Sequence, residues 1–476
     1  MSTFIVALVD LEWYFIDVNN LGDFSSSFVF DKEDILVSFQ TTDLIREISS
    51  REAVLPIIID LESLEKQVAQ EGKDLRNYSE WKVLKRLKYH KIIDPSFKIT
   101  RENIKDFLQN IFNFYKFLIE KDSTETARFE NIERKINAII HKVQKAGISV
   151  NLEIAEKRCK ELEKIIYVIK NELQLKHLIF APDNIKAQIK YIKERNYPII
   201  KSPFYTFRIR KRGDEVCRLF YELIRNQRDL DSLLFMLSQW GGKKHTHPTY
   251  LGFGTITSRI ILREPSLQNL RKSNRDIIVP DKGMKLLYID YAQFEAGILA
   301  SLSKDAALIN LYKSDIYIDI ATKVLGDKNE RSDAKIIFYR YMYGDRSLPK
   351  EAILYFQQFD KLQAYEAEVK NELLKEKIIG TENGNFRKLY EDETGWALSH
   401  KVQATASYIY KSALIRVADE VKSAEFLIPM HDGTVYQIPI KDNGTVALSI
   451  KNIYKEEFQK ICPDIEPIFT VKDSFQ

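Results

Sequence analysis

Two aspartates that each follow an apolar run are the residues best suited to chemistry in this sequence. Residues 284–289 form a run of strand length that ends in Asp290, and residues 425–430 lead to Asp432-Gly433 before a second apolar run. An Asp-Gly pair between apolar runs is typical of a hairpin. If the strands are neighbours, both carboxylates can share divalent metal ions. Taken singly, a helix cap for Asp290 and a turn residue for Asp432 are the favoured interpretations.

A second chemical feature is a stripe of cations and aromatic rings on one predicted helix. The stripe consists of Arg331, Lys335, Tyr339 and Tyr343. A spacing of four residues places them on one face of a helix, which we expect to end at Gly344. Two cations followed by two rings suit a triphosphate with its sugar and base. Seen alone, an amphipathic helix with a solvated charged end is the favoured interpretation.

The composition is that of a globular protein with an uneven charge distribution. Of the 476 residues, 45% are hydrophobic and 29% are charged, which excludes a disordered chain. The formal net charge is only +4, but residues 181–280 hold 19 Lys and Arg against 9 Asp and Glu. This block, with a net charge of +10, is interleaved with aromatic residues, as in surfaces that bind a phosphate backbone and stack bases. Charge alone fits a solvated lysine-rich face equally well.

The sequence has neither the long apolar runs of a membrane protein nor the cysteine pattern of a disulfide-rich protein, which excludes both classes. No apolar run approaches the ~18 residues of a membrane span. The three cysteines, Cys159, Cys217 and Cys462, are far apart. Their spacing suits a reducing compartment and argues against a disulfide framework or a zinc site.

In this order, the segments resemble the family A DNA polymerases, the group of bacterial DNA polymerase I and several phage replicative polymerases. Asp290-Tyr-Ala-Gln-Phe-Glu295 matches the first palm motif, His431-Asp432 begins the last palm motif, and the stripe matches the fingers-helix motif Arg-x3-Lys-x3-Phe/Tyr-x3-Tyr-Gly. Thr257-Ser258-Arg259 with Pro265-Ser-Leu-Gln-Asn269 is similar to the family's Thr-Gly-Arg…Pro-Asn-Leu-Gln-Asn segment. Gln403 stands where the family has a helix glutamine that touches DNA, and residues 130–151 resemble the helix and turn that open the polymerase domain. The order of these matches over roughly residues 128–476 makes chance improbable.

The resemblance implies an α+β fold, the right-hand palm, fingers and thumb of a polymerase, with a degenerate RNase H-like domain of the exonuclease type at the N-terminus. The expected ranges are 1–125 for the degenerate 3′–5′ exonuclease-like domain, 126–240 for the palm entry and thumb, 241–305 for the palm with the first catalytic aspartate, 306–398 for the fingers, and 399–476 for the palm with the second. Helical periodicity separately predicts helices over residues 128–145 and 152–175.

The resemblance also implies the roles of the site residues. Asp290 and Asp432, with the backbone carbonyl of Tyr291, are expected to hold two Mg²⁺ ions, with Mn²⁺ as a substitute. Lys335 is the expected proton donor to pyrophosphate. The expected nucleotide-binding residues are Arg331, Lys335, Tyr339, Tyr343, Gln293, Glu295 and Tyr317. The expected DNA-binding residues are Arg259, Gln268, Asn269, Gln403 and His431. Glu295 and Tyr343 correspond to the pair that excludes a ribose 2′-hydroxyl, which favours deoxynucleotides.

The chain departs from the family pattern at several positions. Gly433 replaces the glutamate that follows His-Asp, so one supporting carboxylate is missing. Ala296-Gly297 replaces the Leu-Arg that follows Glu295 in the family. Arg340 replaces a glycine after the fingers aromatic, and Tyr317 replaces a histidine that reaches the phosphate. We expect these changes to affect fidelity and rate more than the class of reaction.

The first 125 residues have few of the carboxylates that a two-metal exonuclease needs. Asp10-Leu-Glu12 and Asp60-Leu-Glu62 each match an Asp-x-Glu pair. Neither Asn-x3-Phe-Asp nor Tyr-x3-Asp occurs in residues 1–125. We therefore predict a shortened scaffold domain without proofreading.

The leading hypothesis is a template-directed DNA polymerase that adds dNTPs to a primer 3′-hydroxyl by two-metal phosphoryl transfer. A polymerase specialised for lesion bypass or untemplated extension and a catalytically inert, polymerase-like DNA-binding protein are the alternatives. The expected partners are primer-template DNA and dNTPs, with a processivity or replisome protein as a further candidate and no membrane. We expect a monomer in the cytoplasm of a bacterial or phage-infected cell, serving replication or repair.

Overall fold

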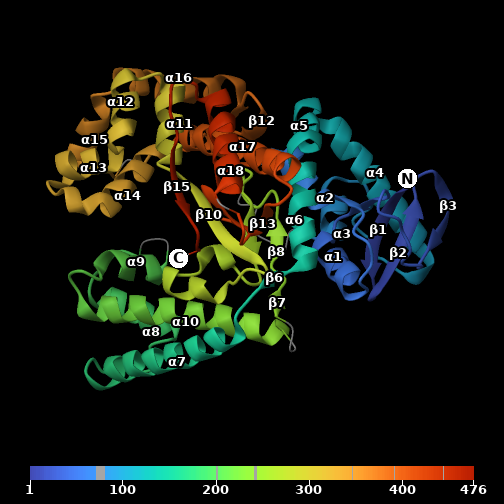
Figure 1. The fold of residues 1–476 in the computed structure, drawn as a ribbon, viewed down its shortest axis with the longest axis horizontal. Coiled ribbons are helices and arrows are strands. Elements are labelled where there is room, and N and C mark those ends of the chain that lie inside the picture. The colour runs from blue at the N-terminus through green and yellow to red at the C-terminus, as the bar shows by residue number, and fades with distance from the viewer. Residues whose placement is uncertain are drawn as a thin grey trace. The chain divides into compact units, whose positions relative to one another are not determined.

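The computed structural model describes residues 1–70, 81–199, 202–240, 244–345, 347–390, 392–442 and 444–475 (Figure 1). The domain boundary expected at residue 241 lies outside these ranges. The chain folds into two compact units. The first unit comprises residues 1–146, 250–261 and 283–474, and the second comprises residues 147–249, 262–282 and 475–476. In the described ranges, no helix is both long enough and apolar enough to cross a membrane.

The first unit begins with a five-stranded sheet in the order β3-β2-β1-β4-β5. Its strands are β1 (Thr3–Val9), β2 (Glu12–Asp17), β3 (Asn20–Ser25), β4 (Ile35–Ser38) and β5 (Ile57–Asp60). β1 is antiparallel to β2 and parallel to β4. Successive side chains of β1 point to opposite faces, so Ile5 joins a core with α4 and Val6 joins a core with α1. The helices of this region are α1 (Thr41–Ser50), α2 (Leu61–Ala69), α3 (Val83–Tyr89) and α4 (Ile104–Lys121).

The segment after α4 leads from this sheet into the rest of the first unit. It consists of α5 (Ser123–Arg128), a π-helical turn (Phe129–Glu133) and α6 (Arg134–Ala146). A helix was predicted here over residues 128–145, and the structure confirms a helix along this stretch, with a π turn over Phe129–Glu133 before α6. The wider π turn before it directs Glu133 to a fully buried position.

The second unit is mainly helical. Its elements are β6 (Ile148–Ser149), α7 (Leu152–Leu175), α8 (Ile185–Glu194), α9 (Pro203–Arg210), α10 (Glu215–Trp240) and β7 (His245–Thr246). The structure confirms the helix predicted over residues 152–175, whose N-terminus is capped by the Asn151 side chain. α7 packs against α10, and β6 pairs with β7. Two further short strands, β8 (Thr249–Leu251) and β9 (Ile261–Arg263), stand where the sequence passes from one unit to the other.

A four-stranded antiparallel sheet forms the centre of the rest of the first unit, in the order β13-β14-β10-β15. Its strands are β10 (Met284–Ala292), β13 (Glu425–Pro429), β14 (Gly433–Pro439) and β15 (Ile468–Lys472). The helices packed with it are α11 (Phe294–Ser303), α17 (Ala397–Glu420) and α18 (Thr445–Ile461). The ring of Tyr291, on β10, stacks on Phe294 with centroids 4.2 Å apart and also packs against Tyr454. This aromatic core fixes the strand that contains Asp290.

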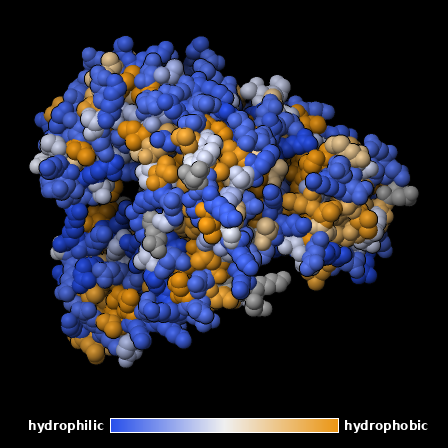
Figure 2. All heavy atoms as spheres, in the orientation of Figure 1, coloured by the Kyte–Doolittle hydropathy of each residue, from blue (hydrophilic) through white to orange (hydrophobic). Residues whose placement is uncertain are grey.

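Helices between α11 and α17 complete the first unit. They are α12 (Ala306–Ser314), α13 (Ile316–Ile320), α14 (Arg331–Met342), α15 (Lys350–Gln357) and α16 (Asp360–Glu376), followed by the hairpin β11 (Ile378–Thr381) and β12 (Gly384–Lys388). Tyr341 of α14 stacks on Phe356 of α15 with ring centroids 3.9 Å apart. On the face shown in Figure 2, hydrophilic residues cover most of these helices.

Candidate active site

The two aspartates lie on neighbouring strands. Asp290 pairs in register with Gly433, the residue that follows Asp432, and the Tyr291 amide donates to the Asp432 carbonyl at 3.0 Å. His431 and Asp432 form a two-residue hairpin turn, because the Met430 amide donates to the Gly433 carbonyl at 2.7 Å. The predicted hairpin is confirmed. The prediction that Asp290 ends its strand is wrong, since β10 continues through Ala292 to pair with β15.

The Asp432 side chain has an unused acceptor. Its Oδ1 atom is buried and has no hydrogen-bond partner among the residues that the structure describes. A buried carboxylate oxygen without a donor is costly unless a cation or a ligand satisfies it. Together with the adjacent Asp290, this atom gives the site the character of a cation-binding centre.

The stripe of cations and rings lies on α14 and just beyond it. Arg331 opens the helix, and its Nε atom lies 2.8 Å from Asp315 Oδ2. Lys335 has no carboxylate partner in the described part of the chain, and its Nζ atom lies 5.7 Å from the ring centroid of Tyr339. The helix ends at Met342 with Tyr343 as its C-cap, and Gly344 follows in a left-handed conformation with φ of 68°, so the predicted stop at Gly344 is confirmed. Arg331 is therefore anchored, whereas the Lys335 ammonium is available to an anion.

Tyr317 lies beneath the two cations. The Arg331 guanidinium carbon and Lys335 Nζ lie 5.1 Å and 5.7 Å from its ring centroid. The side chain is only 1% exposed, and burial, with the charges of Glu295 and Asp432, raises the pKa of the phenol. The structure thus uses the ring face to support the cations. The predicted contact of the hydroxyl with a phosphate stays a prediction.

Glu295 and Arg259 form a buried ion pair at the start of α11. Arg259 Nη2 contacts Glu295 Oε1, and burial raises the pKa of Glu295 while Arg259 opposes that shift. From α17, Gln403 Nε2 donates to the Tyr343 hydroxyl at 2.5 Å. The Gln403 side chain also opposes the raised pKa of Glu295. The structure therefore brings together the pair predicted to select the sugar and two residues predicted to contact DNA.

The remaining predicted site residues are distributed differently. The Gln293 amide is used internally, because its Oε1 atom accepts from the Ile316 amide at 2.9 Å and its Nε2 atom donates to the Tyr312 carbonyl. His431 is exposed at the tip of the hairpin turn. Gln268 and Asn269 belong to the second unit, where Gln268 Oε1 accepts from a backbone amide at 2.9 Å. The first unit alone therefore does not contain the whole predicted set.

The carboxylates of the N-terminal sheet have local partners. Asp60 caps α2, because its Oδ1 atom accepts from the Glu62 and Ser63 amides. Its Oδ2 atom accepts from the Ser63 hydroxyl at 2.7 Å, and burial raises its pKa. Glu12 accepts from the Tyr14 hydroxyl at 2.6 Å, and Asp10 lies in an exposed turn with φ of 48°.

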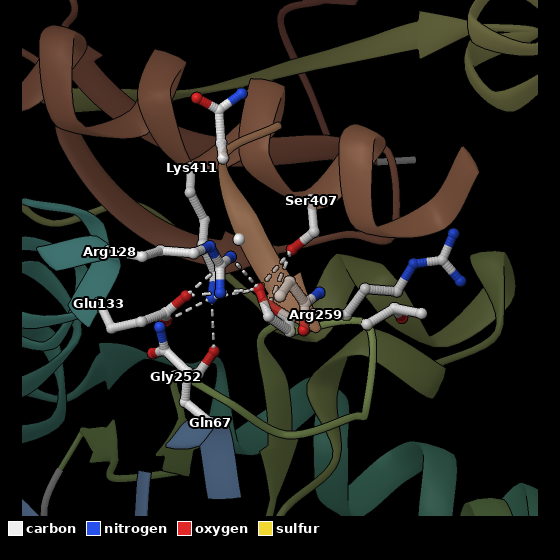
Figure 3. Close-up of polar contacts among 12 residues, drawn as sticks. Gln67, Arg128, Glu133, Gly252, Arg259, Ser407 and Lys411 are labelled. Atoms are coloured by element: carbon white, nitrogen blue, oxygen red, sulfur yellow. Dashed lines mark hydrogen bonds and ion pairs between the residues drawn. The ribbon is translucent and has the colours of Figure 1, made fainter. Parts of the chain in front are cut away.

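A buried polar cluster behind Arg259 was missed by the sequence analysis (Figure 3). We name it the Lys411 network, and it consists of Arg128, Glu133, Ser258, Ser407 and Lys411. These residues come from segments more than 100 positions apart, so no spacing in the sequence relates them. The one available signal was a lysine inside a helix whose other central residues are mostly apolar or small.

Comparison with known proteins gives consistent results. Residues 140–465 match the model of DNA polymerase family A. DNA polymerase I of Caldicellulosiruptor bescii is 26% identical over 393 residues, which cover 70% of this chain and 45% of that protein. The thermostable DNA polymerase I of Thermus aquaticus is 24% identical over 394 residues, which cover 70% of this chain and 46% of that protein. The chain thus spans less than half the length of these relatives.

A solved structure shares the fold along nearly the whole chain. The POL domain of Pol1 from M. smegmatis, in complex with DNA primer-template and dNTP, matches with a TM-score of 0.76 and 17% identity. The match covers 99% of this chain and 95% of that chain. It confirms the polymerase-domain fold of mixed helices and sheets, whereas the exonuclease-like character of the first 125 residues stays a prediction.

Proposed function

The chain belongs to DNA polymerase family A, and on this premise we propose that it is a template-directed DNA polymerase. It adds dNTPs to the 3′-hydroxyl of a primer. The observation that supports this proposal best is the register of β10 and β14, which sets Asp290 beside the residue that follows Asp432. The relatives of this chain in Caldicellulosiruptor bescii and Thermus aquaticus are named DNA polymerase I.

Asp290, Asp432 and the Tyr291 carbonyl are the oxygen donors that would hold two Mg²⁺ ions, with Mn²⁺ as a substitute. Carboxylate and carbonyl oxygens are the ligands that Mg²⁺ prefers, and the unpartnered Asp432 Oδ1 fits such a role. When bound, the ions supply charge stabilisation for the primer 3′-hydroxyl and for pyrophosphate. No group of three or more His, Cys, Asp or Glu side chains gathers at a metal-ligand spacing in the described ranges, so backbone and substrate oxygens complete this donor set.

The side chains of α14 and α11 bind the incoming nucleotide. Arg331, oriented by Asp315, and Lys335 bind the triphosphate, and Lys335 donates a proton to the leaving pyrophosphate oxygen. Tyr339 and Tyr343 pack on the base and sugar. Buried Glu295 leaves no room for a ribose 2′-hydroxyl, so the enzyme selects deoxynucleotides.

Each unit contains residues proposed to contact DNA. In the first unit these are Arg259, Gln403 and His431, which bind mostly at the backbone of the DNA, and in the second unit they are Gln268 and Asn269. The basic block of residues 181–280, most of which belongs to the second unit, attracts the duplex through its phosphates.

The N-terminal domain acts as a scaffold without proofreading. Asp60 is fully used as a helix cap and Glu12 is bonded to Tyr14, so neither is arranged to hold a metal ion with the other. The Gln67 Nε2 atom of α2 instead donates to Glu125, whose Oε1 atom accepts from the Phe386 amide of β12 at 2.6 Å. These contacts brace the helices that follow.

Primer extension tests the proposal. The purified chain is given a primed template, Mg²⁺ and dNTPs, and we expect one nucleotide to be added per templating base. Asp290→Asn and Asp432→Asn should abolish addition, whereas Asp473→Asn, which changes an exposed carboxylate 3.9 Å from Lys285, should not. No addition by the wild type would favour an inert DNA-binding protein, and addition without a template would favour a specialised polymerase.

A further inference from the structure

The turn of residues 255–259 determines where the Arg259 side chain begins. It is closed by hydrogen bonds from the Ser258 amide to the Thr255 carbonyl at 2.9 Å and from the Arg259 amide to Thr255 Oγ1 at 3.0 Å. Ser258 has φ of 57°, a left-handed conformation that a residue with a β-carbon adopts only when its surroundings hold it there. The side chains behind the turn therefore decide its shape.

Lys411 of α17 supports this turn from behind (Figure 3). Its ammonium is fully buried and lies 2.5 Å from Glu133 Oε2, 3.0 Å from the Gly252 carbonyl oxygen and 3.1 Å from Ser258 Oγ. These three acceptors match the three protons of an ammonium group. Lys411 thus connects the helix that contains Gln403 with the segment that contains Arg259.

Ser258 is held by the rest of the Lys411 network as well. Its hydroxyl lies 2.8 Å from Arg128 Nη2 and 3.0 Å from Ser407 Oγ, and Ser407 also donates to the Ser258 carbonyl at 2.8 Å. Glu133 Oε1 lies 3.1 Å from Arg128 Nη2, so two buried cations share one carboxylate. Each member is buried, and both cations of the network pair with Glu133 rather than with Glu295.

A gain in folding stability does not explain why charged side chains occupy this buried position. Apolar side chains of similar size usually give at least as much stability as buried ion pairs, because burying charge is costly. Burial lowers the pKa of Lys411 to about 8 even though Glu133 opposes the shift. The charged side chains instead fix the geometry of the turn, because each of their hydrogen bonds holds one atom of the turn or of its flanking segment.

We propose that Lys411 is a positioning residue for Arg259, holding the 255–259 turn so that the guanidinium meets Glu295. The inference rests on the proposed polymerase function. Lys411 touches neither substrate nor metal, and acts only through Arg259. Loss of the ammonium lets the turn move, so that Arg259 both binds DNA less well and leaves Glu295 without its cation. We therefore expect weaker primer-template binding and poorer discrimination against ribonucleotides.

A double-mutant cycle between Lys411→Met and Arg259→Ala tests this inference. Methionine fills the same space and leaves Arg128 and Glu133 paired, so no lone charge is buried. Lys411→Met should lower kcat/KM for dNTP addition about 10- to 100-fold, as expected for a displacement near 1 Å. The double variant should be no worse than Arg259→Ala alone. Lys401→Met is the matched control on the same helix, because it removes a partly exposed pair with Glu372.

Primer-template affinity, measured by fluorescence anisotropy, gives a readout that needs no turnover. If the wild type adds no nucleotide, the proposed function fails and this binding cycle still decides the role of Lys411. If Lys411→Met does not fold, Ser258→Ala takes its place in both cycles, since it removes the hydroxyl and keeps the β-carbon. Additive losses in the double variant, or a folded variant that binds and extends DNA like the wild type, would overturn the inference.

Discussion

Replacing Gly433 by alanine is expected to slow nucleotide addition about 100-fold. A β-carbon built at Gly433 would lie 2.4 Å from the Ile289 carbonyl oxygen, 2.6 Å from Asp290 Oδ1 and 2.7 Å from Asp290 Cα. Ordinary contacts at such a carbon begin near 3.4 Å, so β14 must move about 1 Å away from β10. Two of the three atoms are backbone and cannot rotate aside. The movement would separate Asp290 from Asp432.

The size of the effect follows from this displacement. Overpacking of this kind costs about 1–3 kcal/mol of folding stability. A 1 Å error in the placement of reacting groups costs about 100-fold in rate, equivalent to about 2.7 kcal/mol of activation free energy. Restoring the carboxylate that the family pattern has at this position, by Gly433→Glu, should therefore lower the rate at least as much as alanine does.

Single-turnover addition of one dNTP, at saturating Mg²⁺ and DNA, measures the chemical rate without product release. Thermal unfolding of the same samples shows whether the protein remains folded. Gly213→Ala is the control, because a β-carbon there meets nothing within 4 Å. A wild-type rate for Gly433→Ala, or a faster rate for Gly433→Glu, would refute the reasoning from strand spacing.

Three further outcomes are expected. Burial lowers the pKa of His400 to about 4, so the unfolded state binds more protons below pH 6.5 and stability falls from there toward pH 4. In chemical denaturation, the free energy of unfolding of His400→Gln should fall by about 3 kcal/mol less than that of the wild type between pH 6.5 and pH 4. An unchanged dependence of stability on pH would contradict this. A labelled mispaired primer with Mg²⁺ and no dNTP should stay intact, and shortening that depends on Asp10 or Asp60 would show proofreading. Glu295→Ala should accept ribonucleotides about 10- to 100-fold more readily than the wild type, and unchanged selectivity would remove Glu295 from sugar selection.

Local patterns predicted the long elements well and their ends less well. The helix over residues 152–175 was predicted to the residue, since its amphipathic repeat starts at a capping asparagine. The stripe helix stops at the predicted glycine, but Tyr343 lies just past its last helical residue, because helix ends depend on backbone hydrogen bonds that periodicity does not encode. The π turn at residues 129–133 was missed for the same reason.

The candidate site was predictable where its residues follow one another in motifs, and not where it depends on distant contacts. The two apolar runs around Asp-Gly were enough to predict the hairpin of β13 and β14. The pairing of β10 with β14, which sets Asp290 opposite Gly433, stood only as a condition, because nothing local in the sequence relates two strands so far apart. The Lys411 network joins three segments through side-chain hydrogen bonds. Apart from a lysine among the apolar and small residues of its helix, a single sequence contains no signal for such contacts, because the other members are ordinary polar residues in their own segments.

Two departures from the family pattern have opposite physical reasons. At position 258 the pattern has glycine, and this chain has serine in a left-handed conformation that costs roughly 1–2 kcal/mol for a residue with a β-carbon. The serine hydroxyl gains partners in Arg128, Ser407 and Lys411, which glycine lacks. At position 433 the pattern has glutamate, and this chain has glycine because β10 leaves no space for a side chain. A Ser258→Gly variant should therefore relieve strain and lose anchoring at once, whereas any side chain at position 433 only adds strain.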